Sequence, residues 1–141
     1  MTTKQLQTIL EVRTDGRGFS DVTAQVERCV QKSGVQTGLC TVLLQHTSAS
    51  LVIQENADPS VRDDLLCFFD RLAPEDTRLY THTTEGPDDM PAHLKAALLR
   101  TSETIPVREG RLALGTWQAL YLFEHRRAPH TRKLVVHVVG E

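Results

Sequence analysis

The last stretch of the chain constrains the fold more than any other segment. Residues 134–139 read Leu-Val-Val-His-Val-Val, and valine-rich sequence of this kind strongly favours a β-strand. We expect that strand to cover residues 132–139, preceded by strands at 104–108, 111–114 and 116–125. Because only short turns separate these segments, the last third predicts an antiparallel sheet.

The first two thirds of the chain mix strand and helix patterns. Alternating side chains predict strands over residues 4–13, 37–45 and 50–54. Three helices are also expected, beginning in turn at Ser20 or Asp21, at Asp58–Pro59, and at Asp89 with Pro91. Gly34 and Pro74 should end the first two. The expected fold class is therefore α+β: a mainly antiparallel sheet packed with about three helices, in one domain over residues 1–141.

Composition excludes several classes of protein. The chain is 40% hydrophobic and 24% charged, with a net charge of −2, which is ordinary for a globular domain and too acidic for general binding to nucleic acid or a membrane surface. No signal-peptide core or membrane-length apolar run is present, so we expect a cytoplasmic protein. Cys29, Cys40 and Cys67 form no CxxC pair, and we expect all three to be buried, reduced thiols.

Three histidines are the first candidates for chemistry. His46 follows a predicted buried strand and is followed by Thr47 and Ser48, a position equally typical of a cleft and of a plain surface histidine. His82 and His93 flank an acidic loop, and neutral imidazole is both a metal ligand and an acid–base group. None of the three has local zinc-site spacing, so a metal site requires the fold to bring them together.

Further polar groups lie near other element ends. Glu55 and Asn56 have no evident structural task, whereas Asp58 is sufficiently explained as a helix cap. The turn Gly115–Gln118 could offer backbone N–H groups to an anion, although most glycines between strands are ordinary turns, and its Trp117 could equally be a core aromatic. The basic stretch 124–133 could bind a small phosphorylated ligand, or it could simply be a solvated hairpin tip. GxSxG and P-loop motifs are absent from the sequence.

Several segments together resemble the YjbQ family, also called the secondary thiamine-phosphate synthase family. The matching segments are Gln45–His46–Thr47–Ser48–Ala49–Ser50, Glu55–Asn56, Asp58–Pro59, Ala92–His93–Leu94–Lys95, Pro106–Val107, Gly110, Leu112 and Leu114–Gly115–Thr116–Trp117–Gln118. The Gly-Thr-Trp-Gln segment is the most specific. The chain departs from the family pattern at Ser48, where many members have a second Thr, and near Arg132, because the usual Gly-Pro-Arg turn is replaced by residues 128–132.

The resemblance implies a fold, an assembly and an activity. Members form a small α+β fold that assembles as a homotrimer, which would place the pocket near a subunit interface. The activity that the resemblance implies is the joining of hydroxymethylpyrimidine pyrophosphate to thiazole phosphate, which gives thiamine phosphate and releases pyrophosphate. Since the family name marks this activity as secondary, the physiological reaction stays open. A divalent metal, Mg or Zn, and small phosphorylated substrates are expected.

On the interpretation that the resemblance implies, we assign roles to residues as hypotheses. The catalytic set is His46, Thr47, Ser48, Glu55 and His93. The substrate anion is assigned to Lys95, Gly115, Thr116, Gln118 and Arg132. The metal is assigned to His46, His82, His93 and Asp58. Two alternatives use the same residues: a metal-dependent hydrolase of a small phosphorylated metabolite, and a non-enzymatic module that binds an anionic metabolite.

Overall fold

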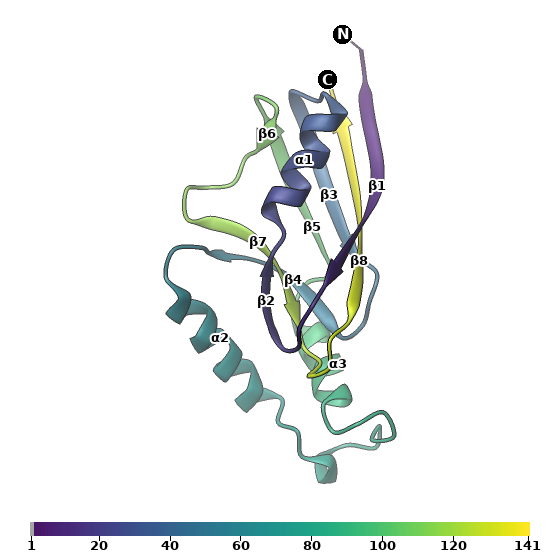
Figure 1. Ribbon diagram of the computed structural model, residues 1–141, viewed down its shortest axis with the longest axis vertical. Coiled ribbons are helices and arrows are strands. Elements are labelled where there is room, and N and C mark those ends of the chain that lie inside the picture. The colour runs from purple at the N-terminus through teal and green to yellow at the C-terminus, as the bar shows by residue number, and fades with distance from the viewer. Residues whose placement is uncertain (1) are drawn as a thin grey trace.

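A computed structural model describes residues 2–141 and arranges the strands in two antiparallel sheets (Figure 1). The strands are β1 (Lys4–Arg13), β2 (Gly18–Asp21), β3 (Thr37–Leu44), β4 (Ala49–Glu55), β5 (Ser102–Arg108), β6 (Arg111–Leu112), β7 (Gln118–Glu124) and β8 (Thr131–Gly140). One sheet has the order β1-β8-β3-β5-β6 and the other the order β2-β7-β4. Met1, part of the expected domain, lies outside the described residues.

Three α-helices accompany the sheets, which confirms the expected α+β class. They are α1 (Thr23–Ser33), α2 (Pro59–Leu72) and α3 (Asp89–Leu98), with a short 3-10 helix, η1 (Thr77–Leu79), between the last two. As expected, α1 ends at Gly34, which adopts a φ of 72° that favours glycine. The carboxylate of Asp58 accepts a hydrogen bond from the Ser60 N–H and caps α2, also as expected.

The core lies between the five-stranded sheet, the three-stranded sheet and α1. Alternate residues of β3 and β8 point inward and are buried, among them Val42 and Val136, and they join Val26 and Val30 of α1 in one apolar cluster. The opposite face of the five-stranded sheet exposes larger apolar side chains, which include Ile9 and Leu39.

Helix α2 packs differently from α1. In Figure 1 it lies beside the three-stranded sheet and away from the five-stranded one. None of its residues, all of which the structure describes, is buried, and Phe68 is 49% exposed. The apolar pattern that predicted this helix therefore has no complete partner among residues 2–141.

Strand β2 was not expected. The sequence predicted a turn at residues 15–18 followed by a helix from Ser20 or Asp21, but residues 18–21 pair with β7 instead, and α1 begins at Thr23. The reason is Phe19, whose ring stacks on that of Phe123 in β7 with the ring centroids 4.0 Å apart. This contact stabilises the pairing of residues 18–21 with β7. The carboxylate of Asp21 still accepts a hydrogen bond from the Thr23 N–H.

Two side chains lie outside the core against expectation. Cys67 is exposed on α2, whereas Cys29 and Cys40 are buried as predicted, and all three are free thiols. Trp117 is 63% exposed and lies just before β7, whose residues 119–124 are all buried. Among residues 2–141, no helix is long and apolar enough to cross a membrane.

Candidate metal centre

The ladder between β4 and β7 separates the candidate residues into two groups. Ala49 pairs with Glu124 at one end of the ladder, and Glu55 pairs with Gln118 at the other. We call these the Ala49 end and the Glu55 end. At about 3.3 Å per strand residue, the two ends lie about 20 Å apart.

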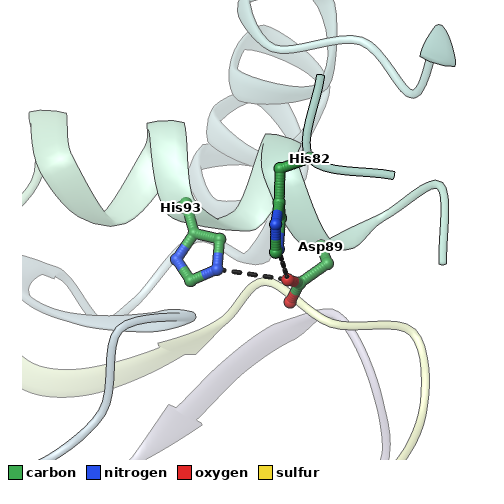
Figure 2. Close-up of side chains that lie close together, drawn as sticks. All are labelled: His82, Asp89 and His93. Atoms are coloured by element: carbon green, nitrogen blue, oxygen red, sulfur yellow. Dashed lines mark hydrogen bonds and ion pairs between the residues drawn. The ribbon is translucent and has the colours of Figure 1, made fainter. Parts of the chain in front are cut away.

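Three side chains of types that can bind a metal meet beside the Ala49 end. The Nε2 atoms of His82 and His93 lie 2.7 and 3.1 Å from the same oxygen, Oδ2 of Asp89. One donor atom from each of the three residues lies within 4.8 Å of the other two. Figure 2 shows both rings turned toward this one carboxylate. The Asp89 side chain is only 4% exposed, while the imidazoles are partly open to solvent.

The second nitrogen of His93 fixes which atom faces the carboxylate. Its Nδ1 lies 3.1 Å from the backbone oxygen of Thr47, and a carbonyl oxygen can only accept, so Nδ1 carries a hydrogen. In a neutral ring, Nε2 then presents its lone pair to Asp89. Such a contact is favourable only when a proton or a metal cation lies between the two atoms. A backbone bond that orients a ring in this way is typical of metal-ligating histidines.

The charges around Asp89 keep its carboxylate ionised. Burial alone raises the pKa of Asp89, but hydrogen bonding with His82 and the charge of Arg126 outweigh it, and the pKa lies below its usual value. The hydrogen bond to Asp89 in turn raises the pKa of His82. An ionised carboxylate with two imidazoles is a donor set that suits a divalent transition metal.

The fold brings together two of the four residues assigned to a metal, His82 and His93, and adds Asp89. Sequence reasoning treated Asp89 as the cap of α3, but the N-cap position is Asp88, which makes no side-chain cap bond. Asp89 lies in the first turn and faces His93 one turn later. That i, i+4 spacing on a helix is the sequence signal that could have identified the pair.

The other two assigned metal ligands lie outside this cluster. Asp58 is at the Glu55 end, where its carboxylate accepts hydrogen bonds from the backbone N–H and the hydroxyl of Ser60. The Nε2 of His46 accepts a hydrogen bond from the backbone N–H of Lys133 at 2.9 Å. Burial, reinforced by the charge of Arg132, lowers the pKa of His46, so the ring is neutral. His46 is nonetheless next in sequence to Thr47, whose carbonyl orients His93.

Both cations assigned to substrate anions are buried and paired within the chain. Arg132 is 3% exposed and contacts both carboxylate oxygens of Glu124, and its guanidinium also donates to Ser48. Lys95 is 2% exposed, and its Nζ lies 2.8 Å from Oδ1 of Asp70. Their charges are thus balanced by carboxylates and stabilise the fold around the Ala49 end.

The remaining candidates form a hydrogen-bonded loop at the Glu55 end. Glu55 accepts hydrogen bonds from the backbone N–H groups of residues 57 and 58. Asn56 donates to the carbonyl oxygen of Thr116, and the Gly115 N–H donates to the side-chain oxygen of Gln118. Within one chain, this loop does not meet the histidine cluster.

Arg126 lies in the basic stretch for which sequence reasoning left two roles open, binding of a small phosphorylated ligand and a solvated hairpin tip. Instead its guanidinium donates to the carboxylates of Asp88 and Asp89 and to the backbone oxygen of Glu85.

Comparison with known proteins decides the family. The profile described as "UPF0047 protein YjbQ-like" matches residues 8–141. The chain belongs to the YjbQ (UPF0047) family. UPF0047 protein sll1880 of Synechocystis is 56% identical over 140 residues, which cover 99% of this chain and 95% of that protein. UPF0047 protein YjbQ of Escherichia coli O157:H7 is 43% identical over 136 residues, covering 96% and 98%.

Solved structures of similar proteins share the fold of this YjbQ family member. Protein APE1520 of Aeropyrum pernix superimposes with a TM-score of 0.87 at 31% identity, covering 96% of this chain and 99% of that one. SSO2532 of Sulfolobus solfataricus, described as a YbjQ-like protein of unknown function, gives 0.85 at 28% identity, covering 97% and 99%. None of these descriptions names an activity.

Proposed function

We propose that this YjbQ family member is a metal-dependent enzyme that acts on a small phosphorylated metabolite in the cytoplasm. The observation that carries the proposal is the convergence of His82, Asp89 and His93 on one point, with donor atoms within 4.8 Å of one another. When bound, a divalent metal polarises a phosphoryl oxygen or activates a water molecule. The chain would hold it through two imidazole nitrogens and one carboxylate oxygen.

The donor set favours a zinc-like metal over magnesium. Magnesium prefers oxygen ligands and keeps several waters, whereas imidazole nitrogen suits zinc and its neighbours in the first transition row. Three protein ligands leave a coordination position open, which is typical of catalytic rather than structural zinc sites. The partial exposure of both imidazoles is consistent with access for a substrate.

Two reactions fit such a centre. Thiamine-phosphate synthesis, the activity implied by the family resemblance, needs a cation to stabilise the departing pyrophosphate. Hydrolysis of a phosphorylated metabolite is the second candidate, and the open two-histidine, one-carboxylate site favours it because this arrangement serves metal-activated water. In both reactions the ring of His93 would be fixed by the carbonyl of Thr47.

We also propose that the protein works as a homotrimer with a site completed by a neighbouring subunit. Two observations support this. The Glu55 end lies about 20 Å along the ladder from the Ala49 end, at about 3.3 Å per strand residue, and the histidine cluster lies beside the Ala49 end, so one chain does not place both around one small substrate. In addition, apolar side chains of α2 such as Phe68 and Leu72 are half exposed, as expected of an interface.

The test begins with metal binding. Metal-free protein is titrated with Zn²⁺ and, separately, with Mg²⁺ by calorimetry, beside Asp89→Asn and the control Asp76→Asn, which alters an aspartate that contacts Arg78 only. We expect tight, one-to-one Zn²⁺ binding and weak Mg²⁺ binding. Asp89→Asn should lower the Zn²⁺ affinity by more than about 100-fold, since even outer-shell changes cost about 10–100-fold. Equal affinity in all three proteins contradicts the site.

Turnover is measured next with the zinc-loaded protein. One assay supplies the pyrimidine pyrophosphate and the thiazole phosphate and detects thiamine phosphate, and the other detects phosphate released from small phosphate esters. We expect His46→Ala and His93→Ala to lower whichever rate the wild type shows. A wild type that binds zinc but turns over neither substrate is a metabolite-binding module, and ligand-induced thermal stabilisation without turnover would identify it as one.

A further inference from the structure

The side chain of Arg126 holds three groups of the segment that carries the metal ligand. Its Nε donates to Oδ2 of Asp88 at 2.9 Å, its Nη1 to Oδ1 of Asp89 at 2.7 Å, and its Nη2 to the backbone oxygen of Glu85 at 3.0 Å. Three different nitrogens of one planar group thus fix both ends of residues 85–89. This is the segment that enters α3 and follows His82.

The carboxylate of Asp89 is divided between Arg126 and the histidines. Oδ1 accepts from Arg126, while Oδ2 faces the Nε2 atoms of His82 and His93 (Figure 2). Rotation of the carboxylate would break the bond to Arg126. The guanidinium therefore determines which oxygen is presented to the histidine pair and in which direction.

The position of Arg126 is itself fixed. It follows the last residues of β7, and its backbone N–H donates to the buried carboxylate of Glu124 at 3.2 Å. The neighbouring His125 N–H donates to the backbone oxygen of Ser48 at 3.3 Å. The guanidinium accordingly extends from the buried Ala49 end of the ladder toward residues 85–89. Its hydrogen bonds to the buried carboxylates of Asp88 and Asp89 connect the ladder to this segment.

We propose that Arg126 is a positioning residue of the metal centre. It does not contact the metal. It sets the coordination geometry by orienting Oδ2 of Asp89 and by holding residues 85–89 at a fixed distance from His82. Lysine cannot replace it, because the three donors of an ammonium group lie on one nitrogen and cannot reach the three separate acceptors that Nε, Nη1 and Nη2 of the planar guanidinium reach. The inference rests on the metal site proposed above.

The test compares Arg126→Lys with Arg127→Lys. Both changes keep the positive charge, and Arg127 is the matched control because its side chain is exposed and, among the described residues, pairs only with Glu75. Each protein is titrated with Zn²⁺ in competition with a chromophoric chelator, and each is loaded with Co²⁺ for visible spectroscopy, which reports coordination geometry. Thermal unfolding without metal verifies that every variant is folded.

We expect Arg126→Lys to lower the Zn²⁺ affinity by about 10–100-fold, as outer-shell changes do, and to shift the Co²⁺ absorption bands. Arg127→Lys should match the wild type in both. If Arg126→Lys does not fold, Asp88→Ala removes one anchor of Arg126 and should shift the bands in the same way by less. A wild type that binds neither metal overturns the proposed function, whereas unchanged bands in a metal-loaded, folded variant overturn only the role of Arg126.

Discussion

The two ends of the β4–β7 ladder organise their polar residues in opposite ways. At the Ala49 end, charged side chains are buried and paired with one another, as Glu124 is with Arg132. At the Glu55 end, polar side chains bond mainly to nearby backbone, as Glu55 does to residues 57 and 58. The first arrangement crosslinks distant segments, whereas the second shapes a local loop.

This difference determines what each end can do alone. A metal centre needs donor atoms held to within a fraction of an ångström, and paired charges around Asp89 supply that rigidity. The loop of residues 115–118 is exposed and presents no comparable cluster, so it suits contact with a substrate or with a neighbouring subunit. The comparison therefore fits the metal binding that we propose for the Ala49 end and a role in recognition for the Glu55 end.

The largest effect is expected from breaking the buried pair at the Ala49 end. Arg132→Met leaves the Glu124 carboxylate, 1% exposed, without its charged partner. We expect a loss of about 3–5 kcal/mol in the free energy of unfolding, measured with urea. Arg62→Met, which removes hydrogen bonds to Tyr121 and Glu55 near the other end, should cost about 1 kcal/mol. Similar losses of unfolding free energy in the two variants would contradict the proposed difference between the two ends.

A smaller effect should appear when the pH is lowered, through His125. Burial, reinforced by the charge of Lys95, lowers the pKa of His125 to about 3, and its Nε2 pairs with the hydroxyl of Ser50 at 2.8 Å. The folded protein keeps this ring neutral while the unfolded chain takes up a proton below its ordinary pKa of about 6.5. Stability is therefore fully present above that pH and is lost as the pH falls.

The expected loss is about 1.4 kcal/mol per pH unit below 6.5, or about 2 kcal/mol at pH 5. Urea unfolding at pH 7 and pH 5 measures it in the wild type and in His125→Gln, which has no imidazole to titrate. The wild type should lose about 2 kcal/mol more than the variant between the two pH values. Parallel losses would show that His125 is not held neutral by the fold.

The smallest effect on stability is expected at the Glu55 end. Gln118→Leu removes the acceptor of the Gly115 N–H, a 2.8 Å bond at the surface. We expect a loss of about 0.5 kcal/mol in the free energy of unfolding and an unchanged Zn²⁺ affinity. A lower rate of turnover at unchanged affinity would sharpen the division between recognition and metal binding. A change in Zn²⁺ affinity would contradict it.

Much of the fold was predictable from local signals. The strand at residues 4–13 has the bounds that alternation predicted, and Asp58–Pro59 begins α2 because a carboxylate cap and a proline act within one turn. Strand β2 was missed because the stacking of Phe19 on Phe123 joins residues about a hundred positions apart. No window of local sequence contains such a contact.

The site was predictable only in part, for the same physical reason. His82 and His93 were expected as metal ligands, and the fold places them together. Asp89 was missed because a carboxylate at a helix start has a sufficient local explanation. Lys95 and Arg132 were assigned to anions from residue type, yet whether a cation is free depends on the carboxylates that the fold places against it, here Asp70 and Glu124.

The position of β8 in the five-stranded sheet has a consequence for synthesis of the chain. Residues 131–140 lie between β1 and β3 and are the only described strand that pairs with β1. The ribosome makes β1 first and β8 last of these strands, so the sheet cannot close during most of translation. Until then β1 has no partner strand in this sheet and β3 has only β5, so chaperone demand should be greatest for nascent chains that end just before residue 131.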